Sequence, residues 1–337
     1  MRIALCLTAL VAAAPAVKPP AVEIKEWPVP WPNTFTRDPY VAPDGRVFFC
    51  GMSGNYIGVL DTVTGQFKRF DLPRPANPHS LIVDPRGKVW YTGNGGAHIG
   101  RLDPTTGEVT KFPMPDPAAR DPHSLAWDPA GDIWFTVQGS NFVGKLTVAT
   151  GAIRLIAVPT SGARPYGIVI DPSGRPWIDL FGTNKLATVD PATFTLREIT
   201  LPRAAARPRR IARTSDGRIW YGDYAGGFLG AYDPKTEQTR EWAMPSGTSA
   251  QPYAMASDAK DRVWFVETGV QPNRFVGFDS KTSTFLDPVP VPSDVGAVPK
   301  RVSDPQRNTV RNMVFDPKGN AVWFATDLHT VGRARLP

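Results

Sequence analysis

Short hydrophobic runs, separated by turns rich in Asp, Pro and Gly, fill most of this chain. One stretch holds four such runs in succession: "HSLIVD" (79–84), "KVWYTG" (88–93), "HIGRLD" (98–103) and "EVTKFPM" (108–114). The turns between them read "DPRG" and "DPTTG". Asp, Pro and Gly favour tight turns because they preset or tolerate the required dihedral angles. The pattern therefore predicts short antiparallel strands and no long helices.

This group of four runs repeats along the chain. Each unit is marked by an aromatic residue in its second run. The markers are Phe48, Trp90, Trp134, Trp177, Trp220, Trp264 and Trp323, and the five central ones follow at spacings of 43 or 44 residues. Periods of this length are typical of repeat arrays. Four antiparallel strands per unit, repeated seven times, predict an all-β fold, a seven-bladed β-propeller.

The two ends of the chain complement each other. The seventh unit finishes at "VGRARLP" without a fourth strand. Near the other end, "EIKEWPVP" (23–30) belongs to no unit and resembles the fourth strand "EVTKFPMP" (108–115). An open ring would leave unpaired strand edges. We therefore expect the N-terminal strand to complete the last blade.

Two segments lie outside the repeat. Residues 1–16, "MRIALCLTALVAAAPA", have the charge, apolar stretch and small-residue cleavage site of a signal peptide. Residues 17–337 then form a single propeller domain, with an insertion at about 285–308 that would act as a lid or a rigid detour on the funnel face. No other stretch is apolar enough to span a membrane. We expect an exported monomer, periplasmic or secreted.

The charge of the chain narrows the class of partner. The net charge is +7 and the isoelectric point is near 9.5. The basic residues are spread out, except in "RAAARPRRIAR" (203–213), so the chain lacks the basic stripe with stacking aromatics that nucleic-acid binding needs. We expect no nucleic-acid partner, and an anionic small molecule or polysaccharide as the ligand.

Equivalent positions of the units predict a polar funnel at one mouth of the central channel. The first strand of each blade lines the channel, and its leading residues are Arg37, His79, His123, Tyr166, Arg209, Tyr253 and Arg311. Two residues earlier stand Phe35, Asn77, Asp121, Arg164, Arg207, Gln251 and Thr309. The second strands return to the same face with Asn94, Val137, Gln138, Asp179, Asp223, Glu267, Thr268 and Asp327. Convergent polar groups of this kind are the usual setting for a ligand site.

Two of the four histidines share the motif Pro-His-Ser-Leu in adjacent units. Histidine titrates near neutral pH, so His79 or His123 is a candidate general base. Asp121, two residues before His123, would orient it or share a divalent metal such as Mg²⁺ with it. The predicted catalytic residues are thus His123, His79 and Asp121, and the predicted metal ligands are Asp121 and His123. A hydrogen-bonded channel lining remains the alternative. His98 and His329, outside the motif, are expected at the surface.

The arginines of the funnel favour recognition of an anion. Guanidinium groups suit carboxylate, sulfate or phosphate because they donate two parallel hydrogen bonds. The predicted substrate-binding residues are Arg37, Arg164, Tyr166, Arg207, Arg209, Tyr253, Glu267 and Arg311.

Stretches such as "RPYGIVIDPSGRPW" and "IWFTVQGSNFVGKL" resemble the virginiamycin B lyase (streptogramin lyase) family of seven-bladed propellers. The resemblance implies elimination chemistry that opens a cyclic depsipeptide, with Mg²⁺, a histidine base and two glutamates. The family's Glu-Pro-His-Gly in the last blade is replaced here by Thr309, Val310 and Arg311, and Asp327 stands near the second glutamate position. The Pro-His of the preceding blade becomes Pro252 and Tyr253. Arginine cannot abstract a proton at neutral pH.

Two functions from different classes follow. The first is an exported lyase-like or lactone-acting enzyme with an altered active site, which acts on an anionic or cyclic-ester substrate. The second is a non-catalytic propeller that binds an anionic small molecule or polysaccharide. The replaced family positions argue against cleavage of streptogramins, and the sequence favours the enzyme.

Overall fold

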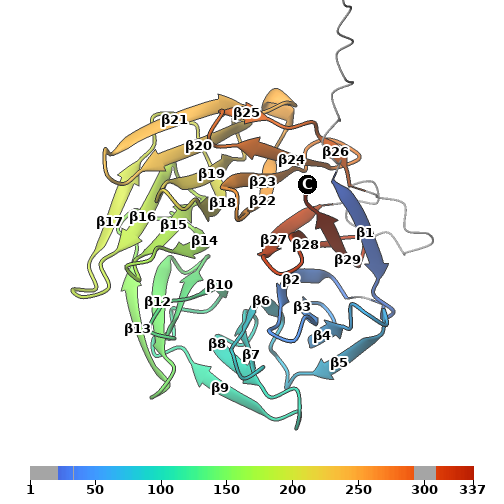
Figure 1. The fold of residues 1–337 in the computed structure, drawn as a ribbon. Coiled ribbons are helices and arrows are strands. Elements are labelled where there is room, and N and C mark those ends of the chain that lie inside the picture. The colour runs from blue at the N-terminus through green and yellow to red at the C-terminus, as the bar shows by residue number, and fades with distance from the viewer. Residues whose placement is uncertain (1–21, 33, 292–308) are drawn as a thin grey trace, which may run out of the picture.

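The strands of the computed structural model form seven antiparallel sheets arranged as blades around a central channel (Figure 1). The structure describes residues 22–32, 34–291 and 309–337. The seven-bladed propeller predicted from the repeat is confirmed. The predicted signal peptide and most of the predicted insertion lie outside the described residues, so export stays a prediction.

The blades follow one another in sequence order, and in each blade the strand beside the channel comes first. Blades 1 to 3 are built from β2 (Thr36–Val41), β3 (Val47–Gly51), β4 (Tyr56–Leu60) and β5 (Phe67–Asp71); β6 (Pro78–Val83), β7 (Val89–Gly93), β8 (His98–Leu102) and β9 (Val109–Pro113); and β10 (Pro122–Trp127), β11 (Ile133–Val137), β12 (Phe142–Thr147) and β13 (Ala152–Ala157). Blades 4 and 5 are built from β14 (Pro165–Ile170), β15 (Pro176–Leu180), β16 (Lys185–Val189) and β17 (Leu196–Thr200); and β18 (Pro208–Arg213), β19 (Ile219–Asp223), β20 (Phe228–Asp233) and β21 (Gln238–Ala243).

The last two blades depart from this scheme. Blade 6 contains β22 (Pro252–Ser257), β23 (Arg262–Glu267) and β24 (Arg274–Asp279), and its outer edge is split into β25 (Thr284–Phe285) and β26 (Val289–Pro290), which both pair with β24. Blade 7 contains β27 (Val310–Asp316), β28 (Ala321–Thr326) and β29 (Thr330–Arg335), with β1 (Glu23–Pro28) as its outer strand. A short 3-10 helix, Gly247–Ser249, precedes blade 6. The described residues include no helix long and apolar enough to cross a membrane.

The N-terminal strand closes the ring as predicted. β1 pairs antiparallel with β29 from Glu23 opposite Arg335 to Pro28 opposite Thr330, and the two lie side by side in Figure 1, blue against red. The Trp27 ring stacks on Trp323 with centroids 5.5 Å apart. Hydrophobic side chains therefore seal the junction between the first and last blades.

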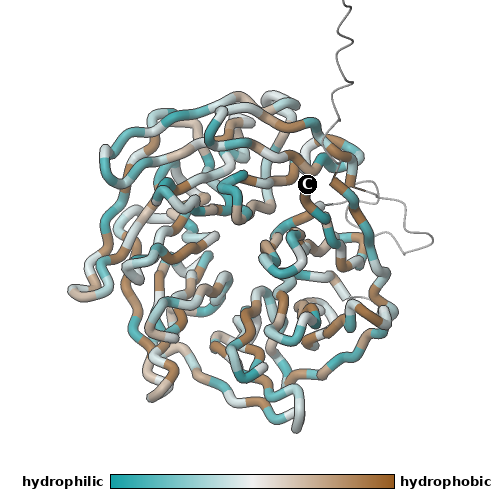
Figure 2. The backbone as a smooth tube through the Cα atoms, in the orientation of Figure 1, coloured by the Kyte–Doolittle hydropathy of each residue, from teal (hydrophilic) through white to brown (hydrophobic). Residues whose placement is uncertain are grey.

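The repeated Asp and Trp of each unit have a structural role. In blades 2, 4 and 6 the indole N–H of the Trp donates to the Asp that opens the first turn. The three pairs are Trp90–Asp84 at 3.2 Å, Trp177–Asp171 at 3.1 Å and Trp264–Asp258 at 2.8 Å. The same carboxylates also accept backbone N–H groups of the turn. The Trp rings are buried between neighbouring blades, and hydrophobic segments recur in every blade (Figure 2).

A bulge at the start of every inner strand shapes the channel mouth. In all seven blades the register between the first and second strands shifts shortly after the first pair, for example between Pro122 and Leu125. A bulge re-aims side chains that would otherwise alternate between the faces of a sheet. Two consecutive residues of an inner strand can therefore reach the channel. Arg210 and Asp38, both at bulges, have positive φ angles of 65° and 23°, which non-glycine residues adopt only when the surroundings enforce it.

Candidate functional site

The leading residues of the seven inner strands meet across the channel. His79 and His123, from adjacent blades, have ring centroids 3.9 Å apart, and the Tyr166 ring lies 4.1 Å beyond His123. His79 is 7% exposed and His123 2%. Burial, followed by the neighbouring His79 and then by the charges of nearby arginines, lowers the pKa of His123 well below its usual value. Burial also lowers the pKa of His79 to about 3. Both imidazoles are therefore neutral at pH 7.

Asp121 does not orient His123. Its carboxylate accepts hydrogen bonds from the backbone N–H of Gly139 and from the N–H and hydroxyl of Ser140, the last two at 3.1 Å. The Nδ1 atom of His123 lies 3.0 Å from the Ser124 hydroxyl instead. Asp121 stands one residue before β10 begins, and its side chain caps the neighbouring loop. The predicted pairing of Asp121 with His123 was wrong for this reason.

The acids that follow the Trp markers also cap backbone groups. Glu267 accepts from the N–H and hydroxyl of Ser246, at 2.9 and 2.5 Å, so both its oxygens are engaged. Glu267 therefore caps the turn at Ser246, and a role for it in substrate binding stays a prediction. Asp179 accepts the Gly167 N–H at 2.8 Å, and burial raises its pKa to about 7.

The residues present do not assemble a metal site. Within the described ranges, no group of three or more His, Cys, Asp or Glu side chains is placed to hold an ion. The predicted ligands Asp121 and His123 have the separate partners given above. Thr309 and Arg311, where the family pattern has Glu and His, offer no carboxylate or imidazole. We therefore derive no chemical step through Mg²⁺ or another divalent ion.

A cationic cluster occupies one side of the mouth. Arg311 forms a two-pronged ion pair with Asp327, at 3.0 Å from Nε and 2.8 Å from Nη2. Arg37 shares the same carboxylate at 3.4 Å. Burial and the charge of Arg311 lower the pKa of Arg37 to about 10. One carboxylate thus faces two guanidinium groups, and the excess positive charge favours an anion.

Tyr253 lies at the centre of the guanidinium groups. Arg209 donates from Nη2 to the Tyr253 hydroxyl at 2.8 Å, and its guanidinium carbon lies 3.7 Å from the ring centroid. The Tyr253 and Tyr166 hydroxyls are hydrogen-bonded to each other. Burial opposes ionisation of Tyr253. The charges of Arg209, Arg311, Arg210 and Arg37 outweigh it and lower the pKa of Tyr253 to about 8.

The other predicted substrate-binding arginines lie at the rim. Arg164 is exposed, with its guanidinium 5.6 Å from the Phe181 ring centroid. Arg207 donates from Nη1 to the Ala206 carbonyl at 2.6 Å. Among the described residues, neither Arg164 nor Arg207 forms a hydrogen bond or ion pair with Tyr253 or Asp327. The inner arginines 37, 209 and 311 therefore form the core of the site.

Arg210, which the sequence analysis did not single out, spans the channel below this cluster. It donates from Nε to the Arg311 carbonyl at 2.9 Å and from Nη1 to the Ser124 hydroxyl at 3.2 Å. Its Nη2 reaches both oxygens of Asp38, at 3.2 and 3.3 Å. Arg210 thus connects four blades. Two consecutive arginines in "PRRIAR" were the sequence signal, because a bulge lets both reach the channel.

Replacing Arg210 with methionine is expected to lower the free energy of unfolding by about 3–5 kcal/mol, because Asp38 would stay buried without its partner. The double replacement Arg210→Met with Asp38→Asn should recover part of this loss, since it removes the orphaned charge. Urea denaturation of the three proteins measures both values. A single variant as stable as the parent would contradict the bridging role.

The His98 and His329 side chains are buried, contrary to the expectation of a surface position. The His98 ring packs edge-on against Tyr91, with centroids 5.8 Å apart. Its place in β8, the third strand of blade 2, keeps it away from the strands that line the channel.

Comparison with known proteins agrees with this fold. The model of the virginiamycin B lyase family matches residues 16–189, just over half of the chain. The chain belongs to the virginiamycin B lyase family. Among curated proteins, none matches it by sequence.

Solved structures with the same fold include members of this family. A streptogramin B lyase structure is 26% identical, with a TM-score of 0.81, and the alignment covers 94% of this chain and 98% of that one. Virginiamycin B lyase from Staphylococcus aureus is 23% identical over 94% of this chain and all of its own, also at 0.81. A catalytically inactive variant of that protein with quinupristin is 22% identical over the same shares, again at 0.81.

Where the resemblance implies a histidine base in the last blade, this chain has an arginine. Arg311 takes the histidine position of the last blade and is tied to Asp327, the residue nearest the second glutamate position. The negative charge of the Asp327 carboxylate is therefore neutralised by Arg311 within the protein. Tyr253, in the preceding blade, is an ionisable group at the mouth whose pKa, about 8, lies close to neutral.

Proposed function

We propose that this member of the virginiamycin B lyase family is an enzyme that binds an anionic substrate at the channel mouth and eliminates a group from it. In this proposal Tyr253 accepts the proton and the arginines hold the anion. The observation that carries it is the position of the Tyr253 hydroxyl, hydrogen-bonded to Arg209 and surrounded by four guanidinium groups.

The pKa values favour Tyr253 over the histidines as the base. A general base works best when its pKa is near the operating pH. Burial lowers the pKa values of His79 and His123 far below that range, so they are weak bases. Arg311 stays protonated. Tyr253, with a pKa of about 8, has a useful fraction of phenolate near neutral pH and is a stronger base than a histidine of pKa 3.

The arginines supply the second requirement of the reaction. A proton next to a carboxylate becomes more acidic when a cation neutralises the carboxylate. Arg209 and Arg311 are partly exposed above Tyr253 and would bind such a group. The C–H bond then breaks, its proton passes to the Tyr253 oxygen, and the electron pair forms a C=C bond. The neighbouring C–O bond breaks, and the leaving oxygen takes a proton from Tyr166, whose pKa burial raises to about 12.

One observation favours the non-catalytic alternative. Tyr253 is only 2% exposed, so a substrate reaches it only when Arg209 moves toward the bound anion. If Arg209 stays in place, the same cluster would bind an anion at the rim without turnover. This second function, an anion-binding propeller, predicts saturable binding and no product.

The first test is a screen of uronate oligosaccharides, sulfated sugars and lactones for binding, by thermal shift, and for a new conjugated double bond, by ultraviolet absorbance. The Arg209→Gln variant should bind the anionic hit about 10- to 100-fold more weakly, since a charge-assisted hydrogen bond contributes about 1.5–3 kcal/mol. The loss should be larger at low salt, where charges are less screened.

The matched control is Arg197→Gln, which removes one exposed positive charge on the outer strand β17, far from the channel. It should bind like the parent. Equal weakening by both variants would show a general charge effect and contradict a site at the mouth.

A further inference from the structure

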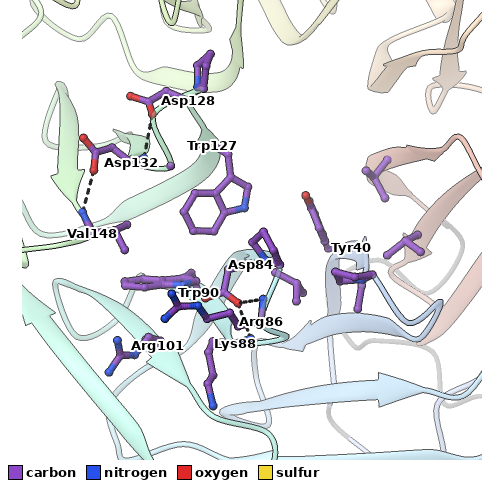
Figure 3. A pocket seen from close by; sticks show the side chains of 18 of the residues that line it. Tyr40, Asp84, Arg86, Lys88, Trp90, Arg101, Trp127, Asp128, Asp132 and Val148 are labelled. Carbon is purple, nitrogen blue, oxygen red and sulfur yellow. Dashed lines mark hydrogen bonds between the residues drawn. The ribbon is translucent and has the colours of Figure 1, made fainter.

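A groove of about 1150 Å³ lies at the opposite end of the channel from the arginine cluster. It is lined by the ends of the inner strands of blades 7, 1, 2 and 3 and by the turns that follow them (Figure 3). The mouth residues stand at the starts of the same strands, so the two sites face opposite ways. The groove exceeds the usual volume of a single small-molecule site, about 300–1,000 Å³, and has room for an extended ligand.

Aromatic side chains form the sides of the groove. Trp127 and Tyr40 project toward the same space from different blades (Figure 3). Trp127 is half-buried and lies edge-on to Trp90, with centroids 6.2 Å apart. Trp127 ends its inner strand where the neighbouring blades have Val83 and Ile170. The repeat therefore does not require an indole here, and part of the Trp127 ring lines the groove.

Most of the acidic side chains of the groove are paired with other groups of the protein. Lys88 forms an ion pair with Asp103, and Lys145 lies 2.9 Å from Asp128 and 3.1 Å from Asp132. Six acidic residues line the groove against four basic ones. An anion would thus meet a surface that is slightly negative, and a cation would compete with lysines already in place. The groove has the opposite charge character from the mouth.

Hydrogen-bonding groups for a neutral ligand are present at the rim. The exposed Arg86 and the partly exposed Arg101 both line the groove, and the guanidinium carbon of Arg101 lies 5.5 Å from the Trp90 ring centroid. Trp and Tyr rings offer an apolar face and a polar edge. A ligand with apolar ring faces and many hydroxyl groups matches this combination of stacking surface and donors.

We propose that this groove binds a neutral oligosaccharide, with one sugar ring stacked on the Trp127 indole and its hydroxyl groups bonded to Arg86 and Arg101. The site is separate from the proposed reaction at the mouth. It would hold an uncharged glycan chain on one face while the other face takes an anionic group.

The test is isothermal titration of the full chain with three hexasaccharides: a neutral glucose oligomer, a neutral N-acetylhexosamine oligomer and a uronate oligomer. At least one neutral oligomer should bind saturably, and the uronate should not compete for the groove. Trp127→Val should weaken this binding at least about tenfold, the effect of losing a central aromatic contact. Valine is the residue of the equivalent position in blade 2, so the variant should still fold.

Tyr253→Phe is the control, because it alters the opposite face and should leave binding of the neutral oligomer unchanged. No saturable binding of either neutral oligomer would overturn the proposal, as would equal affinity in a folded Trp127→Val protein. Loss of oligomer binding in Tyr253→Phe would place the ligand at the mouth and would also overturn it.

Discussion

The Tyr253→Phe variant is expected to lose turnover by about 10²–10⁴-fold, the usual contribution of a general base. The substitution removes only the hydroxyl that would accept the proton. Phenylalanine keeps the aromatic ring, whose centroid lies 3.7 Å from the Arg209 guanidinium carbon. The affinity for the anionic substrate should therefore change little. Steady-state kinetics therefore should show a fall in kcat with a nearly constant KM.

The matched control for this prediction is Tyr224→Phe. The Tyr224 ring also lies against the Arg209 guanidinium, at 4.6 Å, but its hydroxyl is directed to Gln251 and not to Tyr253. Its turnover should stay within a few-fold of the parent. Full activity in Tyr253→Phe together with an inactive His123→Ala would instead assign the base to the histidine that the sequence first indicated.

The pH dependence of turnover follows from the direction of the Tyr253 shift. Its pKa falls from 10 to about 8 in the folded protein, and the phenolate is the form that accepts a proton. The active fraction should thus rise as the pH rises through about 8. The histidines, with pKa values well below 6.5, contribute no change between about pH 6 and 8.

Removal of residues 1–30 should lower the melting temperature by at least about 10 °C, because the truncation deletes β1. The strand and the residue after it bury Trp27 and Val29 in the cluster between blades 7 and 1, where the Trp27 ring stacks on Trp323. Loss of a buried tryptophan alone costs about 3–5 kcal/mol, and each kcal/mol shifts the melting temperature by about 2–4 °C in a chain of this size class. β29 would also become an unpaired edge, which favours aggregation.

The control for the truncation lacks residues 1–21 and keeps β1 intact. Calorimetry should find the parent melting temperature in this protein and a lower one in the longer truncation. If both truncated proteins melt like the parent, the N-terminal strand is not what closes the ring.

Much of the fold could be read from the sequence, because it depends on local rules that recur. The spacing of the tryptophans predicted where each blade begins. Aligning the units on them also predicted which residues, equivalent to His79, lie at the channel. The surplus strand "EIKEWPVP" identified the closure. These features could be predicted because the blades repeat similar turns and a buried aromatic residue, which is Phe48 in blade 1 and a tryptophan in the other six.

The chemistry of the site was harder to predict, because it depends on contacts between blades. Asp121 was expected beside His123 because residues two apart on a strand share a face, but Asp121 precedes the strand and caps a loop. Arg210 was missed because simple alternation would turn it away from the channel, and the bulge turns it inward. The sequence also could not give the depth of burial that weakens the histidines as bases, or the four charges that acidify Tyr253.

The most direct test of this account is a spectrophotometric pH titration of the folded protein and of Tyr253→Phe, since phenolate absorbs at longer wavelength than phenol. The pKa values of the tyrosines 40, 56, 91, 166, 221 and 232 are raised, so they should ionise above pH 10. We expect a distinct step of one tyrosine near pH 8 in the parent, absent from the variant. Identical titration curves for the two proteins, with no ionisation before pH 10, would contradict the proposal that the arginine cluster makes Tyr253 the base.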